Sequence, residues 1–208
     1  LVHPGAGHEH GGTLLNALAN HYGKSLTFDD TFRCGLVHRL DKDTSGVLCI
    51  AKDQDTYKQL QDQFAQRQVT KDYIGITSGN PPSGVIETCI ARDPRHRQRF
   101  CVSQTGKLSR TTLSSLSYDH QHACVWMRPQ TGRTHQIRVH MKALKCPIIG
   151  DRVYGSRTSE YDHHLLHAWR LRIEYNGQSM LFQAPIPSCF NPWLKRFQID
   201  LPSEAELQ

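Results

Sequence analysis

The sequence predicts an α+β fold with a mixed, mainly antiparallel β-sheet and flanking helices. Short runs of alternating or continuous apolar residues, separated by turn residues, follow one another through most of the chain, which is typical of strands. Only a few segments show helical spacing, and they do not alternate regularly with the strands as they would around a parallel sheet. The chain has 208 residues, of which 38% are hydrophobic, and this is enough to bury a substantial core.

Start signals and apolar spacing predict the helices. In the string GGTLLNALANHY, Thr13 is placed to cap a helix whose Leu14, Leu15 and Leu18 share one face. A later helix must end before Pro147, because proline cannot continue a helix. The predicted helices cover 11–22, the segment after the capping residue Asp53, 134–144 and the segment that begins at Asn191-Pro192.

Turn residues set the limits of the predicted strands. Asn176-Gly177 is a strong hairpin signal, and it lies between the apolar runs 165–175 and 179–182. A cluster of glycine, proline and polar residues at 79–84 marks another turn. The other predicted strands are two arms within 36–51, and the segments 72–77, 85–90, 99–103, 111–117 and 123–128.

The charge balance favours a polyanionic partner. Lysine and arginine number 25 against 19 acidic residues, which gives a net charge of +6. Such a surface suits nucleic acid or an anionic membrane face, although many basic proteins bind neither. We expect no membrane insertion, because no apolar run approaches the length of a spanning helix. The opening Leu1-Val2-His3-Pro4 reads as the middle of a strand rather than a signal peptide, so we expect further sequence upstream.

Cysteine and histidine usage predicts neither a disulfide framework nor a metal site. The chain has seven cysteines without a Cys-x-x-Cys pair, which suggests reduced thiols in a cytoplasmic protein. Three histidine clusters have metal-like composition, but none combines a helical i, i+4 pair with a third ligand nearby. These clusters are His8-Glu9-His10, His120-Gln121-His122 and His163-His164.

A charged loop interrupts the first pair of predicted strands, in the string GLVHRLDKDTSGVLCIAKD. The residues Thr44-Ser45-Gly46 favour a tight turn, which would present Asp41 at the edge of the sheet. An isolated buried carboxylate is costly, so Asp41 should have a cationic partner. The alternative is that Asp41 only caps the turn and Arg39 is an ordinary surface residue.

Two further strings hold candidate partners of this loop. In PQTGRTHQIRVH, Arg133 lies near a helix start, and its planar guanidinium matches a carboxylate such as Asp41. In VTKDYIGIT, Lys71 and Tyr73 share one strand face, and the tyrosine could stack on a flat ring. The alternatives are a helix-start arginine that bonds to solvent and a tyrosine that belongs to the core.

Taken together, these strings resemble the RluA/RluD family of pseudouridine synthases. HRLDKDTSG, KDY, TGRTHQIRVH and LLHAWRL follow one another in that order, together with LVHPGAG, GGTLLNALANHY, GDRVYG and QAPIP. The resemblance covers most of the chain. It implies a pseudouridine synthase catalytic domain over 1–208, with the fold of that family. The small RNA-binding S4 domain that many members carry before this domain is not visible in the sequence.

The resemblance implies an isomerase that converts specific uridines of large-subunit ribosomal RNA to pseudouridine, with no cofactor and no metal. Asp41 matches the catalytic aspartate, and Tyr73 matches the tyrosine that packs on the target base. Arg133 matches the basic residue paired with the aspartate, and Leu166 matches the aliphatic wall of the pocket. Arg39 matches the arginine that enters the RNA stack when the uridine is flipped out, a step that costs a few kcal/mol.

The resemblance leaves other functions to weigh. A synthase of the same family could act on transfer RNA, the chain could be a non-catalytic RNA-binding factor of ribosome assembly, or it could be a uridine-specific glycosylase. The string ARDPRHRQRF is expected to contact phosphates, or else it is a solvated charged loop. We expect a monomer that acts on RNA in the cytoplasm.

Overall fold

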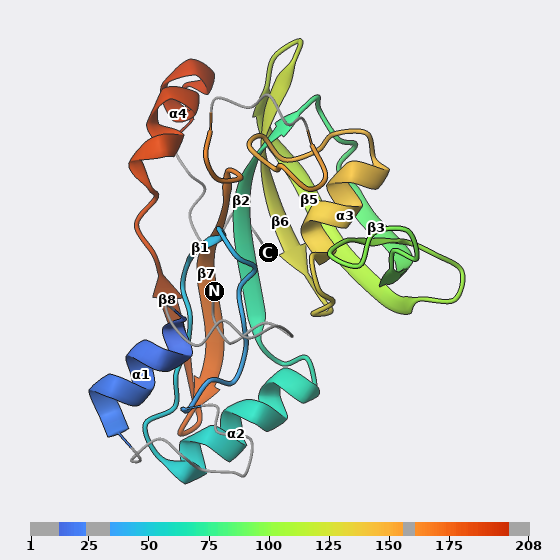
Figure 1. Ribbon diagram of the computed structural model, residues 1–208. Coiled ribbons are helices and arrows are strands. Elements are labelled where there is room, and N and C mark those ends of the chain that lie inside the picture. The colour runs from blue at the N-terminus through green and yellow to red at the C-terminus, as the bar shows by residue number, and fades with distance from the viewer. Residues whose placement is uncertain (1–12, 24–33, 156–160, 200–208) are drawn as a thin grey trace. The chain divides into compact units, whose positions relative to one another are not determined.

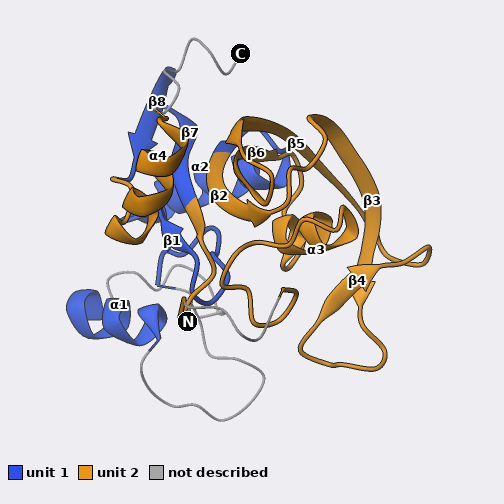
Figure 2. Ribbon diagram, turned by 90° about the horizontal axis from the view of Figure 1, so that it is seen from above, with its two compact units in different colours: residues 1–71, 168–184 blue, residues 72–167, 185–208 orange. Residues whose placement is uncertain are grey.

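The computed structural model describes residues 13–23, 34–155 and 161–199. The chain divides into two compact units, coloured separately in Figure 2. Unit 1 comprises Leu1–Lys71 and Ala168–Ala184, and unit 2 comprises Asp72–His167 and Pro185–Gln208.

Unit 1 contains one helix before the charged loop, one helix after it, and a hairpin from the C-terminal part of the chain (Figure 1). Thr13 caps the first helix and Asp53 caps the second, each by accepting a backbone N–H from the first turn, as predicted. Asn176 and Gly177 both have positive φ, 51° and 72°, which is the turn geometry that an Asn-Gly hairpin requires. The elements are α1 (Leu14–Tyr22), β1 (Ser45–Gly46), α2 (Gln54–Ala65), β8 (Gln178–Gln183) and the part of β7 (Leu166–Tyr175) that begins at Ala168.

The arms of the charged loop are extended but form little regular strand, so the prediction of two strands over 36–51 was wrong in this respect. The arms meet at a bridge between Leu36 and Ile50 and at a bond from the Ala51 N–H to the Gly35 carbonyl, 2.9 Å. The physical reason lies at Cys49, whose N–H donates to the side chain of His38 and not to a backbone carbonyl. The backbone pairing between the two arms therefore ends close to the bridge between Leu36 and Ile50.

Side chains of the two arms alternate between two apolar clusters, as the period of extended backbone requires. One set packs with α2 and β7, and the other set packs with α1. Because apolar side chains pack on both faces of the arms, the two ends of the loop between them are held in place by the core. The first set is Val37, Val47 and Cys49, and the second is Leu36, Leu48 and Ile50.

Unit 2 is an antiparallel sheet in the order β2, β6, β5, β3, β4, with α3 packed against it (Figure 1). The predicted strands are confirmed with small changes in their limits. The helix predicted over 134–144 begins at Gln136, because His135 adopts a left-handed φ of 56° and ends a turn. The elements are β2 (Thr70–Ser78), β3 (Gly84–Arg92), β4 (Phe100–Val102), β5 (Lys107–Tyr118), β6 (His122–Pro129), α3 (Gln136–Ala143), η2 (Ser188–Phe190) and α4 (Asn191–Phe197).

The main core of unit 2 lies between α3 and the sheet. Ile137 and Met141 of α3 pack there against Met127 and Leu113 of the central strands. The predicted α+β class, with mainly antiparallel strands and flanking helices, is thus confirmed. Within the described part of the chain, every helix is too short or too polar to cross a membrane.

Candidate active site

Asp41 lies in the tight turn that the sequence predicted. It is half-buried, Arg39 is exposed, and the Thr44 N–H donates to the Asp41 carbonyl at 3.1 Å. Gly46 then returns the chain to β7 with a φ of 121°, where a Cβ would lie 2.1 Å from the Ala168 carbonyl oxygen. Only glycine permits this close approach, which anchors one end of the loop to a strand.

Tyr73 and Leu166 come together in the main core of unit 2. Leu166 is a buried member of the cluster beneath α3, and the half-buried Tyr73 packs against the same cluster. Tyr73 lies opposite Met127 in the sheet register. The preceding Asp72 is buried on the other face of the strand, where it accepts bonds from Trp126 and Arg128. The structure therefore separates the tyrosine from its charged neighbour, as strand alternation predicts.

Arg133 belongs to a turn that Gln136 holds in place. The Arg133 N–H and the Thr131 hydroxyl both donate to Oε1 of Gln136, at 3.0 and 2.6 Å. The guanidinium Nε–H donates to the Leu108 carbonyl at 3.0 Å. This arginine is thus fixed both through its backbone and through its side chain.

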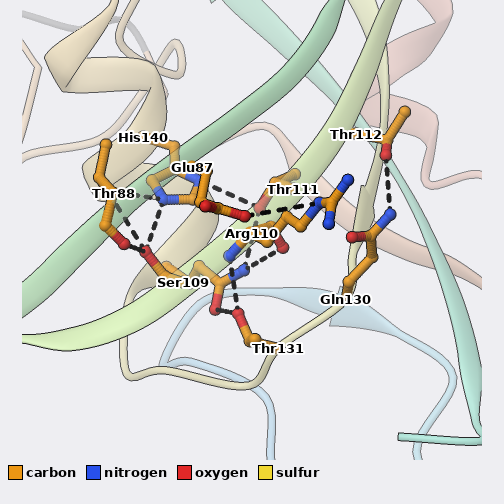
Figure 3. A network of polar contacts seen from close by, with 10 residues as sticks. Glu87, Thr88, Ser109, Arg110, Thr111, Thr112, Gln130, Thr131 and His140 are labelled. Atoms are coloured by element: carbon orange, nitrogen blue, oxygen red, sulfur yellow. Dashed lines mark hydrogen bonds and ion pairs between the residues drawn. The ribbon is translucent and has the colours of Figure 1, made fainter.

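A chain of hydrogen bonds continues from Gln136 across the strands, and Figure 3 labels its members Thr111, His140 and Ser109. The Gln136 amide donates to the Thr111 hydroxyl at 3.0 Å, and that hydroxyl donates to Nδ1 of His140, also at 3.0 Å. Ser109 donates to the Thr88 carbonyl at 2.7 Å, so its oxygen accepts from Nε2 of His140 at 2.9 Å. Burial lowers the pKa of His140 to about 4, and the neutral ring is the form that this chain of bonds requires.

An ion pair between Arg138 and Asp151 was not predicted from the sequence. Nε and Nη2 of Arg138 donate to the two carboxylate oxygens at 2.7 and 2.9 Å. Burial alone would raise the pKa of Asp151, but the bonds and charge of Arg138, with the N–H groups of Tyr154 and Val153, hold it below its usual range. The available signal was the presence of charged residues, Arg138 and Asp151, inside the otherwise largely apolar strings QIRVHM and PIIGDRVYG.

The loop between β3 and β4, residues 93–99, carries most of the basic string predicted to contact phosphates. It is closed by a bond from the Asp93 N–H to the Arg99 carbonyl, 2.9 Å. Arg92 donates to the Arg97 carbonyl at 2.5 Å, while its guanidinium lies over the Phe100 ring. Arg95 and Arg97 are exposed at the tip.

The predicted site residues are thus divided between the units, and the structure groups only Arg39 with Asp41 and Tyr73 with Leu166, while Arg133 lies in a separate turn. Asp41 and Arg39 share the turn in unit 1, whereas Tyr73, Leu166 and Arg133 belong to unit 2. The ion pair between Asp41 and Arg133 stays a prediction. The string LVHPGAG and the cluster His8-Glu9-His10 lie outside the described residues. Among the residues that are described, no three histidine, cysteine or acidic side chains are grouped as metal ligands would be.

Comparison with known proteins gives a consistent family. The family described as RNA pseudouridylate synthase matches residues 2–143. An uncharacterized RNA pseudouridine synthase of Chloroflexus aurantiacus is 40% identical over 203 residues, which cover 95% of this chain and 64% of that protein. The ribosomal large subunit pseudouridine synthase D of Nitrosomonas europaea is 40% identical over 200 residues, with coverages of 90% and 57%. The protein of the same name in Escherichia coli strain K12 is 36% identical over 204 residues, with coverages of 90% and 61%.

Solved structures agree with this relationship. Human RNA pseudouridylate synthase domain containing 1 is 29% identical, with a TM-score of 0.69 and coverages of 83% of this chain and 77% of that chain. Human RNA pseudouridylate synthase domain containing 4 is also 29% identical, with a TM-score of 0.68 and coverages of 81% and 77%. The chain spans 57 to 64% of the length of the curated relatives described above. With a family match over more than half of its residues, the chain belongs to the RNA pseudouridylate synthase family.

Proposed function

We propose that this chain is the catalytic part of an RNA pseudouridine synthase that isomerises specific uridines of large-subunit ribosomal RNA. The observation that carries the proposal is the half-buried Asp41, held in a tight turn inside the segment that matches the family. The names of the relatives from Nitrosomonas europaea and Escherichia coli support a ribosomal target. The net charge of +6 suits an RNA partner in the cytoplasm.

Asp41 is the catalytic residue of this proposal. In the isomerisation, the bond from ribose C1′ to uracil N1 breaks and a bond from C1′ to C5 forms. The C5 hydrogen leaves to solvent as a proton, and N1 gains a proton. The ionised carboxylate acts by attack on C1′, by attack on the ring or by removal of a ribose proton, and each route needs the same negative charge. The reaction is a rearrangement within one nucleotide, so it requires no redox partner.

The other predicted residues bind the substrate. A stacked uridine must leave its helix or loop to be reached, and the exposed Arg39 fills the space that it leaves. Tyr73 packs on the extruded base, and Leu166 of the same cluster is the aliphatic wall of the pocket. Arg133 adds a fixed positive charge to substrate binding, and the loop 93–99 contacts phosphates.

The test is tritium release from RNA that is labelled at uridine C5. The wild-type protein should release tritium from a large-subunit ribosomal RNA fragment, and Asp41→Asn should fall to background. Asp43→Asn is the matched control, because Asp43 is an exposed carboxylate in the same loop and asparagine tolerates its positive φ of 71°. Release by Asp41→Asn at the wild-type rate would refute the assignment.

The same assay separates the competing functions. A synthase specific for transfer RNA would release tritium only from that substrate. A binding factor of ribosome assembly would release none from either RNA. A glycosylase would liberate free uracil, which chromatography detects, whereas an isomerase keeps the base on its ribose.

A further inference from the structure

His38 joins the two arms of the loop that carries Asp41. The Cys49 N–H on the returning arm donates to Nε2 of His38 on the outgoing arm at 2.8 Å. This bond stands next to the backbone bridge between Leu36 and Ile50. Beyond this bond the two arms are no longer paired as strands, and the loop begins.

The acceptor role fixes the protonation of the ring. Because Nε2 accepts a hydrogen bond, it carries no proton, and the proton of the neutral imidazole lies on Nδ1. The ring is stacked on Phe64 of α2, with centroids 4.8 Å apart and planes 17° apart, so its orientation is fixed as well. Burial lowers the pKa of His38 to about 4, and the nearby positive charge of Lys71 acts in the same direction.

A side chain here takes the place of a backbone carbonyl. A buried backbone N–H needs a partner, and in a regular ladder that partner would be a carbonyl of the opposite strand. With His38 as the acceptor, the Cys49 N–H is satisfied at a point where the two arms form no regular ladder. Arg39 follows the histidine directly in the sequence, and Asp41 lies in the turn closed by the Thr44 N–H.

We propose that His38 is a positioning residue, which accepts the Cys49 N–H and thereby fixes the root of the loop that presents Arg39 and Asp41. This inference rests on the proposed function, in which Asp41 is the catalytic residue. A displacement of about 1 Å in a catalytic group can cost roughly 100-fold in rate. The bond from the Cys49 N–H to His38 restrains the start of the loop and so limits such a displacement of Asp41.

The groups that face the ring limit what a change of pH can do. They are the Phe64 ring of α2, the Cys49 backbone of the other arm and the Lys71 ammonium at the start of β2. Protonation of His38 would convert Nε2 into a donor that faces the Cys49 N–H. Burial of the ring opposes that protonation most, and the positive charge of Lys71 adds to it, so the acceptor persists at neutral pH.

Two substitutions separate the hydrogen bond from packing. His38→Phe keeps an aromatic ring on Phe64 but leaves the Cys49 N–H without its acceptor. His38→Gln supplies an amide oxygen as an acceptor that does not titrate. The rate of a single turnover on labelled RNA, measured at saturating protein, should fall about 100-fold in His38→Phe and recover most of the way in His38→Gln.

A control variant and a spectroscopic measurement complete the design. His122→Phe removes a partly buried histidine that packs on Trp193, with ring centroids 4.8 Å apart, and it should keep the wild-type single-turnover rate. Nitrogen NMR of the wild-type protein at pH 7 should show the His38 proton on Nδ1, and the Cys49 amide should exchange slowly. In the wild-type protein, protonation of His38 near pH 4 should lower the single-turnover rate. His38→Gln should lack this decrease, because its amide does not titrate.

The outcomes distinguish this inference from the proposed function. A folded His38→Phe variant with the wild-type rate, beside an inactive Asp41→Asn, would overturn the positioning role alone. An NMR signal that places the proton on Nε2 would also overturn it, and this holds even if His38→Phe cannot be purified. Full activity of Asp41→Asn would instead refute the proposed function.

Discussion

The buried ion pair between Arg138 and Asp151 predicts a large loss of stability on substitution of one partner. The side chains are 5% and 0% exposed. Asp151 accepts both guanidinium bonds and also the N–H groups of Val153 and Tyr154, at 2.9 and 3.0 Å. In Asp151→Asn, one carboxylate oxygen becomes an NH₂ group. The amide can still accept from the backbone, but a donor then faces a donor of Arg138.

The magnitude follows from the burial of the pair. Removal of one partner of a buried pair leaves the other charge uncompensated, which costs about 3–5 kcal/mol. For a chain of this size, each kcal/mol lowers the thermal midpoint by roughly 2–4 °C. We therefore expect Asp151→Asn to lower the midpoint of unfolding by about 6–20 °C in thermal scans at neutral pH.

A second arginine–aspartate pair in the same unit is a matched control. Arg152 and Asp162 are 3.0 Å apart, but their side chains are 58% and 89% exposed. Asp162→Asn should leave the midpoint unchanged within error, because an exposed pair is well solvated in both states. Equal midpoints for Asp151→Asn and Asp162→Asn would refute the reasoning from burial.

The pH dependence gives an independent check of the same pair. The pKa of Asp151 is lower in the folded state than in the unfolded state, so its carboxylate stabilises the fold above the unfolded pKa of about 4. This contribution is lost as the pH falls through the folded pKa. The gap in stability between wild type and Asp151→Asn should therefore narrow below about pH 4. A gap that stays constant down to pH 2.5 would contradict the assigned shift.

Two further predictions concern RNA. Arg39→Ala should slow turnover about tenfold or more on folded RNA, because flipping costs a few kcal/mol, yet little on an unstructured oligonucleotide of the same sequence; equal losses would exclude the stack-filling role. The double variant Arg95→Ser/Arg97→Ser should reduce the slope of log affinity against log salt by about 1.4–1.8, at roughly 0.7–0.9 per lost phosphate contact. Filter binding between low and moderate salt measures that slope, Arg152→Ser is the control, and an unchanged slope would remove loop 93–99 from the RNA surface.

Local signals in the sequence were sufficient for most elements. Thr13 and Asp53 cap their helices because a short oxygen-bearing side chain reaches the first free N–H groups, which depends only on residues three positions away. Asn176-Gly177 forms its hairpin because both residues tolerate positive φ. Period-two alternation likewise placed Tyr73 and Asp72 on opposite faces of β2.

Contacts between distant residues limited the prediction of the site. The sequence showed His38 only as one of several charges in a loop, and the arms beside it read as strands. Its role depends on Cys49, eleven positions further along the chain. Gln136 reaches back to Thr131 and across to Thr111 on a neighbouring strand, which helical spacing does not reveal.

The sequence by itself determined the family, the class of fold and the residues to test, because motifs, caps and turns are encoded over short stretches of chain. Only the tertiary structure decided which polar groups satisfy one another in the interior. Arg138 of α3 meets Asp151 of the segment that follows this helix, and His140 meets Thr111 and Ser109 of β5, at positions where packing buries all of these side chains. A buried polar group must find its partner within that space, and the identity of the partner is set by geometry in three dimensions.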